Sequence, residues 1–158
     1  MNIDQQQLRN TLGQFVTGIS VITTLDLQKQ PVGFTANSFN SVSLDPPLVL
    51  WSLGKSASTY LDFMAAENFG VHILAEDQLE LSNRFASTQD NRFQNLEYHL
   101  EHSIPLLRDC VARFQCHLEH LYEGGDHTIF VARVLDFEYD SSRAPLVYHR
   151  GSYTSLQS

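Results

Sequence analysis

The strongest structural signal in the chain is the segment Gly33-Phe34-Thr35-Ala36-Asn37-Ser38-Phe39-Asn40-Ser41-Val42-Ser43-Leu44-Asp45-Pro46-Pro47. Short neutral hydroxyl and amide side chains crowd its middle part, from Thr35 to Ser43. Residues typical of strands lie on both sides, because the β-branched run Ile19–Thr24 precedes the segment and Leu48–Ser52 follows the two prolines. The pattern therefore predicts a polar segment set between strands of a sheet.

The polar segment has two interpretations. Neutral donors and backbone N–H groups can hold a heteroaromatic ring edge, a polyol and a phosphate without a large desolvation cost, so the segment suits a ligand with many hydrogen-bonding edges. Alternatively, it is a polar loop whose Asn and Ser side chains bond to their own backbone. The segment alone leaves both interpretations open.

Two hairpins are predicted around this segment. Ile19–Thr24 and Val32–Phe34 flank the polar turn Asp26–Gln30, which is typical of a short antiparallel pair. Farther along the chain, Cys110–Tyr122 and His127–Asp140 have strand character and are joined by a Gly-Gly turn. Strands paired through hairpins favour an antiparallel arrangement.

Short helices are expected between the strands. Asp4 can cap the first helix, with Gln7 in a capping-box position, apolar residues at helical spacing up to Val16, and Gly18 as its end. A second helix follows Ser56 or Ser58 and carries Leu61, Met64 and Ala65, and a third covers Gln78–Ala86. Further strands are expected at Val71–Leu74 and Leu146–His149, and Ser87–Asn95 reads as a loop. Without regular strand-helix alternation, the pattern predicts a mainly β protein with short helices, as an antiparallel sheet or closed barrel.

Length and charge narrow the functional classes. The 158 residues, 42% of them hydrophobic, are the usual size of one domain, so we expect a single domain over 1–158. Ten Lys and Arg against 18 Asp and Glu give a net charge of −8, which argues against nucleic acids and anionic membranes as partners. No apolar run approaches the roughly 20 residues that span a bilayer, and the N-terminus lacks signal-peptide features. We therefore expect a cytoplasmic protein.

A second polar segment follows the predicted strand Leu48–Ser52. Its hydroxyls and one cation stand directly before a predicted helix, and they are Ser52, Lys55, Ser56, Ser58 and Thr59. The N–H groups and dipole of a helix N-terminus favour phosphate, with Lys55 as a point charge. The spacing does not match a Walker loop, and ordinary helix capping is the competing interpretation.

Other kinds of site are poorly supported. Cys116 and His120 would be about 13 Å apart along a strand, too far to share a tetrahedral ion, so no metal site is predicted. Cys110 and Cys116 are expected in the core, and two cysteines are compatible with a reducing compartment. No GxSxG elbow indicates a serine hydrolase, and no GxGxxG follows a strand, so any dinucleotide site is not of the Rossmann type.

Four segments together resemble the flavin reductase family of two-component monooxygenase systems, which are small NAD(P)H:flavin oxidoreductases. The segments are residues 15–24, 33–48, 125–131 and 145–153. The resemblance implies an antiparallel split β-barrel of the Greek-key, FMN-binding type. One departure is that Ala132-Arg133 stands where the family usually has Gly-Glu, and we expect it to affect the outer face of that strand and contacts with a partner.

The resemblance also implies roles for individual residues. The flavin ring would be bordered by Thr35, Ala36, Asn37 and Ser38, with Ser41 and Ser43 nearer the ribityl chain and phosphate. The phosphate side would be completed by Ser52, Lys55, Ser56, Ser58 and Thr59, and the flavin would also be approached by Ser82, Arg84 and Phe85. The nicotinamide would approach at His127, Tyr148 and Tyr153, with His127 as the catalytic residue.

The activity implied is hydride transfer from NADH or NADPH to FMN or FAD. In such a reaction the cofactors carry the chemistry and the protein supplies placement and electrostatics. The resemblance further implies a homodimer and a partner monooxygenase that receives the reduced flavin. The alternative is a flavin-binding protein of the same fold with another role: a pyridoxamine-phosphate-oxidase-like enzyme, an electron carrier or a non-enzymatic sensor.

Overall fold

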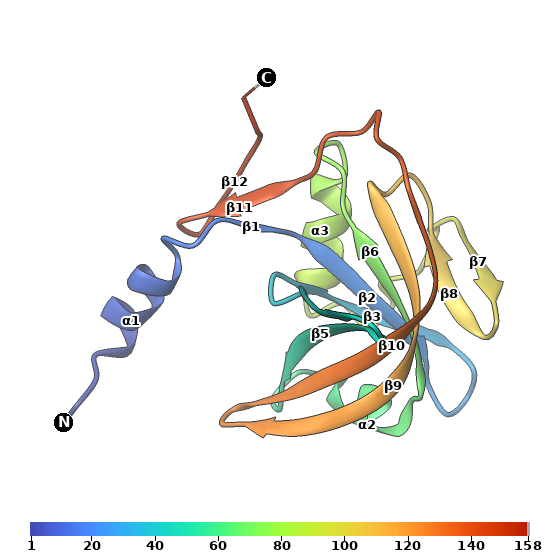
Figure 1. Cartoon of the computed structure of the whole chain (residues 1–158), viewed down its shortest axis with the longest axis horizontal. Coiled ribbons are helices and arrows are strands. Elements are labelled where there is room, and N and C mark those ends of the chain that lie inside the picture. Colours follow the sequence, from blue (N-terminus) through green and yellow to red (C-terminus); the bar gives the residue numbers. More distant parts are fainter. Residues whose placement is uncertain (158) are drawn as a thin grey trace.

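A computed structural model describes residues 1–157 (Figure 1). Three short helices and twelve strands follow one another along the described chain. In chain order they are α1 (Gln5–Leu12), β1 (Thr17–Gly18), β2 (Ser20–Leu25), β3 (Pro31–Ala36), β4 (Asn40–Leu44), β5 (Pro47–Gly54), α2 (Tyr60–Ala65), β6 (Asn68–Ile73), α3 (Leu79–Ala86), β7 (Tyr98–Glu101), β8 (Ile104–Leu107), β9 (Ala112–Gly124), β10 (His127–Tyr139), β11 (Val147–His149) and β12 (Ser152–Thr154). The mainly β class predicted from the sequence is confirmed.

The main sheet has seven antiparallel strands in the order β3-β2-β6-β9-β10-β5-β4. Both predicted hairpins are present. In the first, Ile22 pairs with Phe34, and the Asp26 carboxylate accepts hydrogen bonds from two N–H groups of the turn. In the second, Gly125 has a φ of 71°, a conformation that glycine adopts without strain. Across residues 1–157 the sheet does not close into a barrel, because β3 and β4 are its two edges.

The core inside the curled sheet is aromatic. Trp51 of β5 stacks on Phe130 of β10 with ring centroids 5.7 Å apart, and the two residues are direct cross-strand partners. Phe63 of α2 and Phe69 of β6 pack on this pair, and all four side chains are fully buried. Truncating one such ring to Ala typically costs 3–5 kcal/mol. This cluster therefore fixes the position of β5 beside β10.

A second apolar cluster attaches α3 to the sheet. Phe85 of α3 is fully buried and contacts Phe93 with ring centroids 5.0 Å apart, in the same cluster as Val21 of β2 and Leu74. The cluster holds the end of α3 and the loop after it against β2 and β3 (Figure 1).

The first helix is shorter than the sequence predicts. The Asp4 carboxylate does cap it, but α1 ends at Leu12 and buries none of its residues, and it projects from the sheet in Figure 1. Residues 17 and 18 instead form β1, which pairs with β11, so Gly18 lies in a strand and does not end the helix. Pairing with a strand distant in the sequence overrides the local helical pattern. Phe15 is left 77% exposed.

Some strands were not predicted. The polar residues Asn40–Leu44, for which no strand was predicted, form the edge strand β4, because they pair with β5. The β7–β8 hairpin and β12 also have no counterpart in the prediction. Elsewhere the differences are in the ends, since β6 begins at Asn68 and β9 at Ala112.

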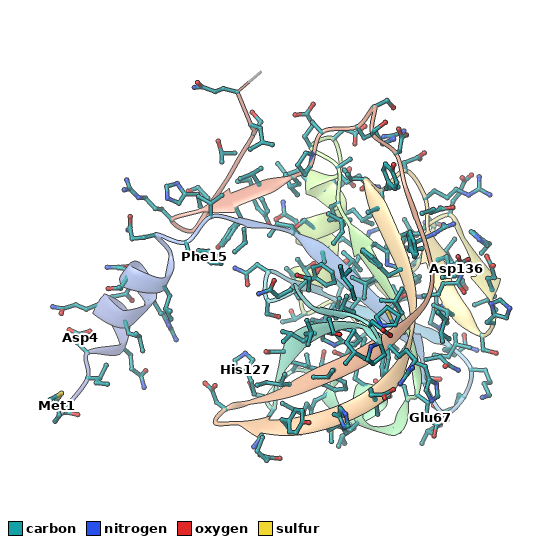
Figure 2. The ribbon with its side chains drawn as sticks, in the orientation of Figure 1. Met1, Asp4, Phe15, Glu67, His127 and Asp136 are labelled. Carbon is teal, nitrogen blue, oxygen red and sulfur yellow. The ribbon has the colours of Figure 1, made fainter. Side chains whose placement is uncertain are left out.

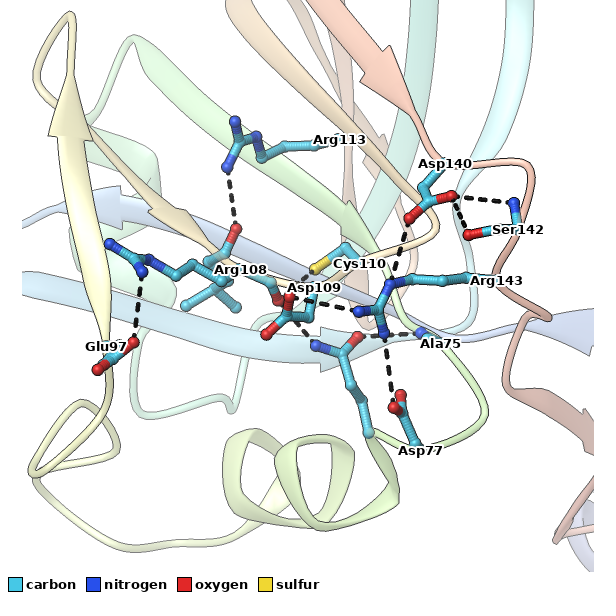
Figure 3. Close-up of polar contacts among 12 residues, drawn as sticks. Ala75, Asp77, Glu97, Arg108, Asp109, Cys110, Arg113, Asp140, Ser142 and Arg143 are labelled. Carbon is cyan, nitrogen blue, oxygen red and sulfur yellow. Dashed lines mark hydrogen bonds and ion pairs between the residues drawn. The ribbon is translucent and has the colours of Figure 1, made fainter.

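The connection between β10 and β11 is held by one arginine, as Figure 3 shows. The Arg143 guanidinium lies 3.5 Å from Asp77, 3.4 Å from Asp109 and 3.4 Å from Asp140. These contacts secure the chain that leads to β11 and β12.

Within residues 1–157, no helix combines the length and apolar character needed to cross a bilayer.

A buried histidine links the strands β2, β6 and β8. His72 of β6 is fully buried; its Nδ1 lies 2.9 Å from the Val21 carbonyl, and its Nε2 accepts the Leu107 N–H at 3.0 Å. These partners require a neutral ring with the proton on Nδ1. Burial is the main cause that lowers the pKa of His72 to about 4; the Val21 hydrogen bond opposes this shift, and the charges of Arg113 and His99 add to it.

We predict that His72 makes the fold sensitive to mild acid. Its pKa is lower in the folded state, so its contribution is present above the unfolded value and is lost as pH falls from about 6.5 toward 4. Between pH 7 and pH 5 the free energy of unfolding should fall by about 2 kcal/mol through this residue. His72→Gln, which retains a donor and an acceptor, should remove this component. Urea titrations at both pH values test this, and an equal pH dependence in the two proteins would contradict it.

Candidate functional site

A cavity of about 1000 Å³ opens where β3 and β5 end and β10 begins, near the loop after α3. Ten of the residues predicted for the site line it: Thr35, Ala36, Asn37, Ser38, Ser52, Ser56, Ser58, Thr59, Phe85 and His127. The structure thus brings together two polar segments that are separate in the sequence, along with the start of β10.

The end of β3 is fixed by hydrogen bonds to its neighbours. The Ser20 hydroxyl donates to the Ala36 carbonyl at 3.0 Å, and the Thr35 hydroxyl donates to the Ser82 carbonyl at 2.7 Å. The next polar residue is held by β5, because the Ser38 hydroxyl accepts the Ser52 N–H at 2.9 Å. Asn37 is exposed on the cavity wall and its side-chain amide has no hydrogen-bond partner within residues 1–157. That amide is available to a ligand.

The connection between β5 and α2 forms another wall of the cavity. Ser56 and Ser58 are exposed there, whereas Thr59 is only 8% exposed. The Thr59 hydroxyl has no hydrogen-bond partner in the described chain. A buried hydroxyl without a partner is unusual in native proteins and calls for an explanation.

Lys55, the cation predicted on the phosphate side of the site, does not line the cavity. The Lys55 ammonium forms an ion pair with Glu123 at the end of β9. The hydrogen bond that the Lys55 ammonium donates to Glu123 raises the pKa of Lys55. A role for Lys55 in phosphate binding stays a prediction.

An arginine that was not predicted lines the cavity instead. Arg92 comes from the loop after α3, and its Nη1 donates to the Gly33 carbonyl at 2.7 Å. Its Nη2 donates to the Ser87 carbonyl and lies 3.4 Å from the Ser58 hydroxyl. Partial burial lowers the pKa of the guanidinium. The sequence offered only a weak signal, namely a single cation inside a polar loop.

His127 stands at the mouth of the cavity, beside the β9–β10 turn (Figure 2). Its Nδ1 lies 2.7 Å from the Asp126 carboxylate, which the same hydrogen bond keeps at a lowered pKa. The side chain is 48% exposed. Its cross-strand partner is Gly54, which has no side chain to cover the ring. The imidazole is therefore oriented by Asp126 and open to a ligand.

Six further predicted residues do not line this cavity. Ser41 and Ser43 lie on the edge strand β4, and Arg84 borders a smaller groove of about 370 Å³. Ser82 is buried and its hydroxyl lies 2.8 Å from that of Tyr153. Tyr148 lines a second cavity of about 1030 Å³ between α1 and β11. The two large cavities adjoin, because both include Leu12 and Asn37.

The cysteine and histidine side chains of residues 1–157 do not form a metal-binding cluster. Within residues 1–157, no three His, Cys, Asp or Glu side chains could hold one metal ion. Cys116 is fully buried in the aromatic core, as predicted, and Cys110 is half-buried beside the second cluster. Burial raises the pKa of both thiols to about 12.

Comparison with known proteins gives a consistent result. The profile of the family described as "Flavin reductase like domain" matches residues 12–157. A "Probable flavin reductase" of Rhizobium meliloti is 42% identical, over 95% of this chain and 48% of its own. "FMN reductase (NADH) SmoA" of Agrobacterium fabrum is 40% identical, over 95% of this chain and 85% of its own.

A solved structure supports the same assignment. The NADH:FAD oxidoreductase SgcE6 of Streptomyces globisporus, in complex with NAD and FAD fragments, superimposes with a TM-score of 0.92 at 36% identity. The match covers 98% of this chain and 93% of that one. The chain spans about half the length of the curated relatives that it matches at 42% identity. By sequence and by fold, this chain belongs to the flavin reductase like domain family.

Proposed function

We propose that this protein reduces FMN or FAD with NADH or NADPH by hydride transfer. The observation that carries the proposal is the cavity at the ends of β3 and β5 and the start of β10, whose polar lining consists mainly of neutral hydrogen-bonding side chains and which adjoins a second cavity of similar size. Membership of the flavin reductase like domain family supports it. SmoA and SgcE6, described above, are both named as reductases that use NADH, and this favours NADH as the reductant.

In this proposal the end of β3 holds the ring system of the flavin. Backbone and side-chain donors of residues 35–38 face its polar edge, and Phe85 of α3 supplies apolar contact. Ser52, Ser56, Ser58 and Thr59 bind the polar tail. The bound flavin supplies a two-electron acceptor. Few of the lining groups carry charge, and such a site can also release its ligand.

His127 is proposed to orient the nicotinamide. Hydride transfer needs the reacting atoms at roughly 3–3.5 Å, so a group that fixes the angle of approach affects the rate. The hydrogen bond to Asp126 leaves Nε2 of His127 facing the cavity mouth. Tyr148 in the adjoining cavity and Tyr153 beside Ser82 are proposed to form the rest of the nicotinamide side.

We assign the sheet to the split-barrel type. Its edges β3 and β4 are consecutive in the chain and joined only by residues 37–39. From Ala36 to Asn40 an extended chain reaches at most about 14 Å. The sheet must therefore curl until its two edges nearly meet, and Phe34 of β3 shares the core of Trp51 on β5.

The reduced flavin is proposed to pass to a partner monooxygenase, in the cytoplasm. Reductase components of flavin-dependent monooxygenases occur among the relatives and support this place in the reaction sequence. Where the sequence departs from the family pattern, Ala132 is buried in the aromatic core and Arg133 forms an ion pair with Glu119.

We further propose that the protein is a homodimer with the flavin near the interface. Leu12, which lines both large cavities, and Phe15, which lines the second, are exposed, and so are Leu8 and Val16 nearby in the chain. Unpartnered apolar groups around a site indicate a missing wall. Light scattering at micromolar concentration should give twice the mass of the chain. An active monomer would contradict this proposal.

The proposed activity predicts flavin-dependent oxidation of NAD(P)H by the purified protein. Under anaerobic conditions, NADH should bleach a large excess of free FMN or FAD over many turnovers. A single stoichiometric bleaching would instead indicate a carrier, and binding without bleaching a sensor. Absence of oxidation with both nucleotides and both flavins would refute the proposal.

We predict that His127→Ala impairs the nucleotide half of the reaction. The KM for NAD(P)H should rise or kcat should fall, by about tenfold for the loss of one oriented hydrogen bond. Flavin affinity and melting temperature should stay close to those of the parent, because the side chain is half exposed. Asp126→Asn serves as a matched variant that keeps the ring but changes its partner. A purely thermal defect would remove His127 from the site.

A further inference from the structure

We infer that Ser82 and Tyr153 are positioning residues. Their hydrogen bond holds the wall of the second cavity against α3, so that a nucleotide bound there meets the flavin in the main cavity. This inference rests on the proposed function and deepens it. It is carried by a continuous series of contacts that runs through the protein from a residue of one cavity wall to a residue of the other.

The series begins at the end of β3. Thr35 lines the main cavity, and its hydroxyl donates to the Ser82 carbonyl at 2.7 Å. Ser82 of α3 is fully buried, and its hydroxyl lies 2.8 Å from the hydroxyl of Tyr153. One residue of α3 is therefore bonded to β3 through its backbone and to β12 through its side chain.

The series ends in the second cavity. Tyr153 of β12 is the direct cross-strand partner of Tyr148 on β11, and the ring centroids of the two residues are 5.4 Å apart. Tyr148 lines the second cavity, whereas Tyr153 lines neither large cavity of the described chain. Tyr153 therefore acts on a ligand through Tyr148 and the strand that carries it.

The hydroxyl of Tyr153 is already engaged within the protein. It donates to the side-chain amide oxygen of Asn83 at 3.3 Å. A phenol has one proton, so the Ser82 hydroxyl is the donor in the shorter bond. Tyr153 consequently has no free proton for a ligand, and the role that its hydroxyl can fill is to fix the position of its own strand.

The bond matters because β12 has few other attachments. β12 is the edge strand of the small sheet β1-β11-β12, which is separate from the seven-stranded sheet (Figure 1). Within residues 1–157, the side-chain hydrogen bonds of β12 are those of Tyr153 alone. Tyr148 and Tyr153 also pack on the apolar cluster around Phe85. That packing keeps the strands near α3, and the hydrogen bond fixes where they lie.

Two variants remove the bond from opposite sides without adding volume, namely Ser82→Ala and Tyr153→Phe. We expect each to raise the KM for NADH about three- to tenfold, the range for loss of one neutral hydrogen bond. The double variant should resemble the single ones, because both changes remove the same bond. Tyr153 is only partly buried, so Tyr153→Phe keeps the test available if Ser82→Ala does not fold.

Flavin binding should change little in the same variants. The dissociation constant of oxidised FMN, measured by fluorescence titration, should shift less than about twofold. The reason is that Thr35 is bonded to the Ser82 carbonyl, which both variants retain. A selective effect on the nucleotide is the result that a merely structural bond would not produce.

A second readout needs neither flavin nor nucleotide. In the free proteins, amide hydrogen exchange should be faster for β11 and β12 in both variants and unchanged for β3. Thr24→Val is the matched control, because it also removes a buried hydroxyl bond, from Thr24 to the Asn68 carbonyl at 2.7 Å. Thr24 lines neither large cavity of the described chain, so this change should lower the melting temperature and leave the KM for NADH unchanged.

A lower melting temperature in Ser82→Ala, with the KM for NADH and the exchange of β11 and β12 unchanged, would overturn the inference. An equal rise of the KM in Thr24→Val would also overturn it, and so would effects that multiply in the double variant. A parent that bound FMN but did not oxidise NADH would refute the proposed function. The exchange rates, which need neither ligand, distinguish that failure from a failure of the inference.

Discussion

The three residues between β3 and β4 constrain the whole structure. They connect the two opposite edges of a seven-stranded sheet, so the sheet has to curl until those edges approach. The hydrogen bond from the Ser52 N–H to the Ser38 hydroxyl fastens this short connection to β5. The curl encloses the aromatic core around Trp51 and Phe130, and the same connection forms a wall of the cavity. The packing of the aromatic core and the shape of the cavity therefore both depend on residues 37–39.

The strands with a strong local pattern could be predicted from the sequence. β2, β3 and β5 are rich in apolar or β-branched residues, and the Gly-Gly turn marks the β9–β10 hairpin. β4 could not be recognised, because Asn and Ser are poor strand formers and pairing with β5 decides their conformation. The sequence pattern predicted that α1 would extend to about Val16, past its actual end at Leu12, for a similar reason: β1 pairs with a strand about 130 residues away.

The site could be predicted where its chemistry is concentrated in the sequence. Thr35–Ser38 and Ser56–Thr59 stand out by composition, and both line the cavity. The placement of Arg92 in the cavity could not be found in this way, because it depends on three acceptors contributed by β3, by the start of its own loop and by the β5–α2 connection. Lys55 shows the converse: its position before a helix suggests phosphate, but Glu123, 68 residues away, binds it.

The central claim is that flavin binds in the cavity at the ends of β3 and β5 and the start of β10. A crystal structure of the protein grown with oxidised FMN tests it most directly. The account predicts the ring system against residues 35–38 and the polar tail of the flavin along the β5–α2 connection. FMN bound elsewhere on the protein, with this cavity left to solvent, would contradict it.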